Sequence, residues 1–139
     1  MEIPPALLQF GIDRGTILLS DSFEDIDHAK FFVIIGINGD KIAGFFFINS
    51  RVHPIIMGKQ EAFSLQYPLR KSDYSFLHYD SFLGANEVHT RSVSALSKSM
   101  EIGQTSIVGF LTEGDLNAVL EACRNSPLFS EAEKREFFY

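Results

Sequence analysis

The amino-acid sequence predicts a single α+β domain over residues 1–139: a small β-barrel or strongly bent sheet of about five or six short strands, with helices at its carboxyl end. Three observations support this prediction. Two apolar runs flank a turn dipeptide, shorter strand-like segments lie on both sides of them, and the hydrophobic period becomes helical after residue 112. With 45% hydrophobic residues, a chain of this length can enclose one core.

The segment before the hairpin is expected to contain a short helix, a strand and a loop. Residues 4–10 are expected to form one helical turn, because proline is tolerated at the first helical position. Residues 15–21, GTILLSD, are expected to form the first strand. Residues 23–29, FEDIDHA, are polar and are expected to form a loop.

A β-hairpin over residues 30–50 is the strongest local signal. The runs FFVIIGI and DKIAGFFFI are joined by Asn38-Gly39, which suits a two-residue type I′ turn and would place Ile37 opposite Asp40. Both runs are apolar almost throughout, which is typical of strands covered on both faces. Gly44 in the second run indicates a bulge or a sharp bend.

Further strands are expected between the hairpin and the helices. Alternation at residues 62–67 predicts a half-buried strand that Pro68 ends, and residues 87–96 and 104–111 are the next candidates. His78 alternates with Phe76 on another strand-like segment and is expected to be buried and hydrogen-bonded.

Two helices are expected at the carboxyl end. Residues 112–115, TEGD, resemble a capping box. The apolar residues that follow share one helical face: Leu116, Val119, Leu120 and Cys123. Cys123 has no second cysteine to pair with and is expected to be a core residue. Residues 125–127, NSP, are expected to end this helix, and Ser130 with Glu133 to begin a second one.

Composition narrows the functional classes. A net charge of −6 disfavours a wide surface for duplex DNA or RNA, but an acidic chain can still hold RNA in a small cationic pocket. The amino-terminal residues do not resemble a signal peptide, and no apolar run approaches the roughly eighteen residues of a membrane span, so a cytoplasmic protein without a membrane partner is expected. Fourteen phenylalanines indicate a thick aromatic core or an apolar surface that a partner covers.

The predicted register gathers polar side chains at the open end of the hairpin. It places His28 opposite Asn49 and Arg51 opposite Ile26. The residues then sharing one face are His28, Lys30, Asn49 and Arg51. A bulge in the hairpin would bring Ser50 onto that face instead. Such side chains can transfer protons or hold phosphate, but they can equally mark the point where the chain returns to water.

Metals and nucleotide cofactors are not expected. The four histidines, at positions 28, 53, 78 and 89, share no helical i, i+4 spacing, and no cysteine joins them. No glycine-rich phosphate loop follows a predicted strand. His53 precedes Pro54 and is most simply a loop residue.

Four segments have an order and spacing that point to a family. They are residues 15–19 (GTILL), residues 30–35 (KFFVII), residues 80–90 (with DSF and NEVHT) and residues 107–116 (IVGFLTEGDL). In this order they resemble the MazF/PemK family of toxin ribonucleases. The resemblance spans most of the chain between residues 15 and 126. It implies an SH3-like barrel with a C-terminal helix, usually in a homodimer.

The resemblance also implies cleavage of single-stranded RNA without a metal, by a toxin that an antitoxin protein would neutralise. The ribose 2′-hydroxyl would attack the adjacent phosphate and leave a 2′,3′-cyclic phosphate, which needs a base, an acid and positive charge. The candidate catalytic residues are Lys30, His28, Asn49 and Ser50. The candidate RNA-binding residues are Arg51, His53 and His89.

Departures from the family pattern leave a second function open. Lys30 replaces an arginine, Phe31 a proline and Asn49 a hydroxyl side chain, and lysine lacks the bidentate fork of arginine. The alternative is a catalytically inactive relative whose Phe-rich surface binds another protein. The polar cluster favours the enzyme, whereas the acidic charge favours the binding module.

Overall fold

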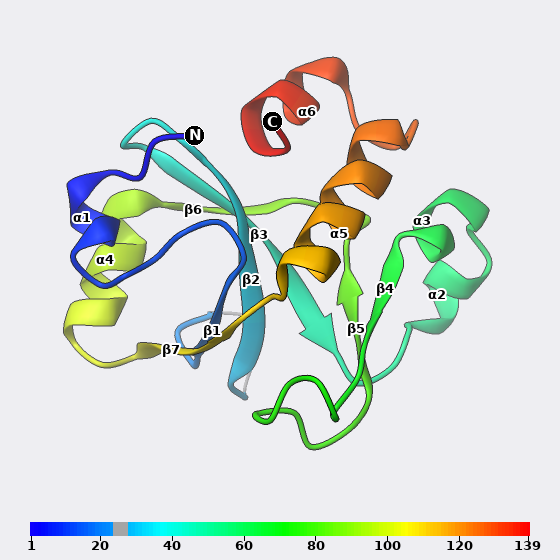
Figure 1. The fold of residues 1–139 in the computed structure, drawn as a ribbon, viewed down its shortest axis with the longest axis horizontal. Coiled ribbons are helices and arrows are strands. Elements are labelled where there is room, and N and C mark those ends of the chain that lie inside the picture. Colours follow the sequence, from blue (N-terminus) through cyan, green and yellow to red (C-terminus); the bar gives the residue numbers. More distant parts are fainter. Residues whose placement is uncertain (24–27) are drawn as a thin grey trace.

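The computed structural model describes residues 1–23 and 28–139. Within them, seven strands form one antiparallel sheet of order β4-β5-β3-β2-β1-β7, and β6 also pairs with β3 (Figure 1). The strands are β1 (Thr16–Ser20), β2 (Lys30–Asn38), β3 (Ile42–Asn49), β4 (Gln66–Leu69), β5 (Ser81–Gly84), β6 (His89–Ser92) and β7 (Thr105–Phe110). The helices are α1 (Pro5–Leu8), α2 (Pro54–Met57), α3 (Gln60–Ser64), α4 (Val93–Glu101), α5 (Glu113–Asn125) and α6 (Glu131–Phe137).

The α+β class is confirmed, and so are the short helix near the amino end and the strands that became β1 and β7. Closure into a barrel is not confirmed. In the described part of the chain, β4 and β7 are the outer strands of the sheet and do not pair with each other. Among the described residues the sheet therefore has open edges at β4 and β7, and β6 is a further outer strand because it pairs with β3 alone.

The central hairpin is covered on both faces, as its continuous apolar runs predict. In β2, Phe32 and Ile34 join a core that includes side chains of α1 and α4. Val33 and Ile35 join a second core that includes side chains of α5 and α6. Figure 1 shows α1 and α4 together, away from α5 and α6. This two-sided burial accounts for runs without the polar alternation of a half-exposed strand.

The predicted two-residue turn is wrong. Asn38 pairs with Ile42 and Ile37 pairs with Ala43 rather than with Asp40, so three residues connect the strands. A type I′ turn needs a positive φ at both central residues. Gly39 has a φ of 58°, but no residue other than glycine has a positive φ in the described part of the chain, Asn38 included. The backbone of Asn38 therefore continues β2.

The irregularity predicted at Gly44 is confirmed, with its extra residue on the partner strand. The register of β2 against β3 shifts between Ile34 and Gly36, and Gly36 pairs with Gly44. Both glycines lie beneath Phe137 of α6. A Cβ atom on Gly36 would lie 2.3 Å from the Phe137 carbonyl oxygen, and one on Gly44 would lie 2.6 Å from its ring. The two glycines thus allow α6 to approach the sheet.

Two strand predictions between the hairpin and the helices are wrong in part. Most of residues 62–67 belong to α3 or to its end, and Pro68 lies within β4 rather than after it. Proline is tolerated there because β4 is an edge strand. Of residues 87–96, only β6 is a strand, because the Ser92 hydroxyl accepts a hydrogen bond from Ala95 N and begins α4. His78 is exposed and lies outside any strand, so its predicted burial is also wrong.

Both predicted helix starts near the carboxyl end are confirmed. The Thr112 hydroxyl accepts a hydrogen bond from Asp115 N and caps α5. The Asp115 carboxylate does not complete a box, because it accepts hydrogen bonds from the hydroxyls of Tyr67 and Tyr74 instead. Burial, together with Asp115, raises the pKa of Tyr67 to about 12. This polar contact ties the start of α5 to β4 and to the loop that follows it.

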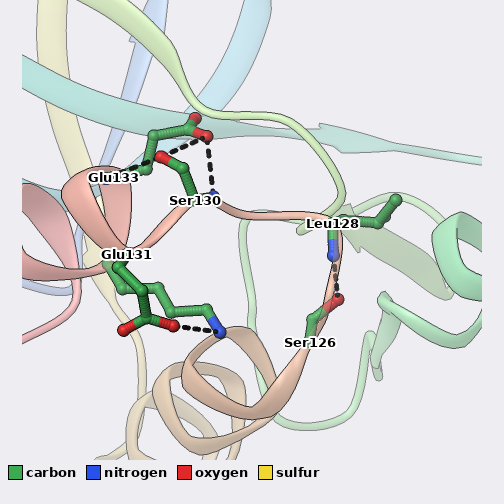
Figure 2. A network of polar contacts seen from close by, with 6 residues as sticks. Ser126, Leu128, Ser130, Glu131 and Glu133 are labelled. Atoms are coloured by element: carbon green, nitrogen blue, oxygen red, sulfur yellow. Dashed lines mark hydrogen bonds and ion pairs between the residues drawn. The ribbon is translucent and has the colours of Figure 1, made fainter.

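The second helix, α6, begins at a complete capping box. The Ser130 hydroxyl accepts from Glu133 N, and the Glu133 carboxylate accepts from Ser130 N, as Figure 2 shows for the side chain of Glu133. Helix α5 ends at Asn125, as predicted. In the connection that follows it, Leu128 N donates a hydrogen bond to the Ser126 hydroxyl (Figure 2). From this start α6 runs to the hairpin, where Phe137 lies against Gly36 and Gly44.

Candidate functional site

A cleft opens on β3 where its two outer neighbours separate. Residues 42–45 of β3 pair with β6, whereas Ile48 and Asn49 pair with β5. Between these two pairings, Phe47 has a paired strand on the β2 side only. The cavity, here called the β3 cleft, has a volume of about 710 Å³. Its walls come from Phe47 and Asn49 of β3, from the segment after β3 through α2, and from the chain between β5 and β6.

Lys30 is connected to the wall of the β3 cleft by a hydrogen bond to Asn49. The register next to the open end of the hairpin, if continued, places Lys30 rather than His28 opposite Asn49. The Lys30 ammonium donates to Asn49 Oδ1 at 2.8 Å and to the Ile48 carbonyl oxygen at 3.4 Å. It also lies 5.5 Å from the centre of the Phe47 ring. The predicted shared face of Lys30 and Asn49 is therefore present, with a different register.

Partial burial changes the acidity of Lys30. Its side chain is half-buried between the two strands, and this burial lowers the pKa of its ammonium from the ordinary value of 10.5. The described part of the chain provides no carboxylate partner for it. Lys30 is consequently a cation that is held in place by neutral groups and is a stronger acid than a lysine in water.

Arg51 and His53 lie on the cleft where the chain leaves β3. Arg51 is exposed and brings a guanidinium to the rim. His53 is also exposed, and its Nδ1 accepts a hydrogen bond from Ile55 N at 3.2 Å, which caps α2. This bond places the ring proton of neutral His53 on Nε2. The sequence assigned His53 to a loop, and the structure adds that it begins a short helix.

His89 forms part of the aromatic floor of the β3 cleft. Its ring centre lies 4.7 Å from that of Phe47 and 5.8 Å from that of Phe45. Burial lowers the pKa of His89 from its ordinary 6.5, and Glu87 opposes this change. The imidazole is therefore neutral at neutral pH, so it can accept or donate a hydrogen bond but is not a permanent cation.

Polar groups that sequence analysis missed complete the cleft. The Gln66 side-chain nitrogen donates to Asn86 Oδ1 at 2.8 Å and to the Ala62 carbonyl oxygen. Both amides line the cavity. A Cβ atom on Gly84 would lie 3.4 Å from Asn49 Nδ2, so this glycine gives the Asn49 side chain room. No local pattern points to these residues, because they come together only when β4 and β5 pair.

Two predicted catalytic residues are not part of the cleft lining. His28 and Ser50 are both exposed, and neither is among the residues that form the cavity. His28 directly follows residues 24–27, and the predicted pairing of Arg51 with Ile26 falls outside the described residues. Ser50 comes directly after Asn49, whose side chain lines the cavity in place of a hydroxyl.

The described residues bring no group of three histidine, cysteine, aspartate or glutamate side chains close enough to hold a metal ion. In the part of the chain that the structure covers, each helix is too short or too polar to cross a lipid bilayer. Comparison with protein-family models and with curated proteins returns no match for this chain.

Proposed function

We propose that the β3 cleft binds single-stranded RNA and that the protein is a metal-independent endoribonuclease, similar to the MazF/PemK toxins in chemistry and in an SH3-like arrangement of its strands. The observation that carries this proposal is the convergence of Asn49, Arg51, His53 and His89 on one aromatic-floored cleft, with Lys30 bound to Asn49. Aromatic rings beside cations and amides suit unpaired bases and their phosphates.

The proposed reaction uses groups at three places in the cleft. Arg51 holds the non-bridging oxygens of the phosphate. Neutral His89 accepts the proton of the 2′-hydroxyl while its oxygen attacks phosphorus and the bond from phosphorus to the 5′ oxygen breaks. The Lys30 ammonium, made more acidic by burial, gives a proton to that leaving oxygen. Asn49 orients Lys30 through their 2.8 Å hydrogen bond.

The test is incubation of the purified protein with mixed-sequence single-stranded RNA in the presence of EDTA. We expect fragments with 2′,3′-cyclic phosphate ends, which disappear in Lys30→Ala and Asn49→Ala but persist in Lys98→Ala, an exposed lysine on α4. His28→Ala and Ser50→Ala measure whether these two residues act although neither of them lines the cleft. Growth arrest on expression would match a toxin. Intact RNA at high protein concentration contradicts the proposal.

A second candidate function is binding of another protein, and an apolar surface beside the cleft favours it. Ile55 and Met57 of α2 and Phe63 of α3 are 62%, 59% and 48% exposed. Contiguous exposed apolar side chains mark interaction surfaces in many proteins. An antitoxin or a second copy of the chain would fit here. Light scattering tests whether a second copy binds here. The unmodified protein should dimerise, whereas a variant carrying Ile55→Ser with Phe63→Ser should stay monomeric.

A further inference from the structure

A second groove adjoins the β3 cleft along the same face of the sheet. We call it the Arg91 groove; it has a volume of about 400 Å³ and is lined by Ser22, Phe23, Phe45, Phe47, His89, Thr90 and Arg91. Phe47 and His89 line both cavities. The two cavities are therefore neighbouring parts of one surface, divided by this pair of rings.

The Arg91 groove combines a cation with an aromatic wall. The Arg91 guanidinium lies 5.5 Å from the Phe23 ring centre and donates to the Ser22 hydroxyl at 2.9 Å. Among the described residues, no carboxylate forms an ion pair with Arg91. One hydrogen bond uses one of the five N–H groups of a guanidinium. Within the part of the chain that the structure describes, most of its donors are thus available to an anion.

The aromatic wall is continuous from one cavity to the other. The Phe23 ring centre lies 5.0 Å from that of Phe47, which in turn lies 4.7 Å from that of His89. Phe47 and His89 are partly exposed, as is Phe23. A row of accessible rings bordered by cations is the arrangement with which proteins hold successive bases of a single strand, and these rings are accessible in part.

We propose that the Arg91 groove is a second subsite for the same RNA strand, in which Arg91 binds a phosphate and the Phe23, Phe47 and His89 rings contact the base of the nucleotide that adjoins the dinucleotide cleaved in the β3 cleft. This inference rests on the proposed function of the β3 cleft. It adds that the protein recognises a segment longer than the dinucleotide at which cleavage occurs.

The experiment measures fluorescence anisotropy of labelled 2′-O-methyl RNA, which the protein can bind but not cleave, as a dinucleotide and as a mixed-sequence hexanucleotide. Arg91→Gln should weaken hexanucleotide binding about tenfold and lower its salt dependence, while dinucleotide binding stays within about twofold. Arg135→Gln, an exposed arginine on α6, is the matched control and should leave both affinities unchanged.

Thr90 keeps the proposal testable if Arg91→Gln fails to fold. Its side chain is exposed in the groove, so Thr90→Glu should weaken and Thr90→Lys should strengthen hexanucleotide binding alone. The second subsite is overturned if these substitutions weaken binding of the dinucleotide and the hexanucleotide equally, or if Arg91→Gln and Thr90→Glu both leave hexanucleotide binding unchanged. Either result leaves the proposal for the β3 cleft intact. A wild-type protein that binds neither RNA overturns the proposed function and the second subsite together.

Discussion

Lys30 is the residue on which the proposed chemistry depends most. It is the first residue of β2, and side-chain alternation places it on the same face as Phe32. Asn49 of β3 lies opposite and accepts its hydrogen bond. Neutral partners hold the ammonium, and burial lowers its pKa. A lysine in this environment can donate a proton that an arginine would keep, because the guanidinium does not lose its charge in proteins.

Replacement of Lys30 by arginine separates charge from acidity. Lys30→Arg should keep RNA affinity within about threefold, since the positive charge stays, but should reduce the cleavage rate about a hundredfold because no proton donor remains. Rates from gel-resolved cleavage and affinities from anisotropy give the two quantities. Cleavage by Lys30→Arg at the wild-type rate would show that Lys30 supplies only charge.

His89 predicts a dependence of stability on pH. Its pKa is lower in the folded protein than the ordinary 6.5, so between these two values the unfolded chain binds more protons. Stability should therefore be at its full value above about pH 7 and should fall as the pH drops through this window toward the lowered pKa. His89→Gln removes the effect, so its melting temperature should change less between about pH 7.5 and about pH 5. If the melting temperatures of the two proteins change equally with pH, the assignment to His89 is contradicted.

At the scale of elements, α6 packs against the hairpin at Gly36. Among the glycines, this is the position where an added Cβ atom would lie closest to another atom. Gly36→Ala would bring a Cβ atom against the Phe137 backbone, which cannot move away as a flexible side chain would. We expect a loss of about 2–4 kcal/mol in the free energy of unfolding, in the upper range for single substitutions. Denaturant unfolding measures it.

Gly114→Ala is the matched control for this contact. Gly114 lies in the first turn of α5, and nothing would meet a Cβ atom there within 4 Å. This substitution should be neutral or stabilise the protein by up to about 1 kcal/mol, because it restricts only the unfolded chain. Similar losses for Gly36→Ala and Gly114→Ala would mean that α6 is not held against β2 in solution.

The elements that sequence analysis assigned wrongly share a cause. Alternation over residues 62–67 suggested a strand, but a segment this short also fits one helical turn, with Ala62 and Leu65 buried and Phe63 exposed. The Asn38-Gly39 turn was wrong because turn type depends on whether Asn38 stays in the paired strand. Neither choice is decided by the residues themselves, since pairing of β4 with β5 and of β2 with β3 supplies the competing free energy.

At the scale of the whole molecule, Cys123 reports on global unfolding. It is fully buried in the core between the sheet and α5, with its sulfur 3.7 Å from the Ala85 carbonyl oxygen. Burial raises the pKa of its thiol to about 12, so the reactive thiolate is scarce in the folded protein. Reaction with dithiobis(nitrobenzoate) should therefore require unfolding and should speed up with denaturant in parallel with the loss of far-UV circular dichroism. Fast labelling of the native protein would contradict this placement.

The sequence by itself determined the α+β class, the doubly covered hairpin, the bulge near Gly44 and both helix starts near the carboxyl end, because each depends on local periodicity, on glycine or on a capping side chain. It also singled out Lys30, Asn49, Arg51, His53 and His89. Only the tertiary structure decided which of these residues share a cleft, since that depends on where β5 and β6 separate along β3. Pairing of strands distant in sequence also brought in Gln66 and Asn86 and left His28 and Ser50 outside the lining, and no local pattern encodes such pairings.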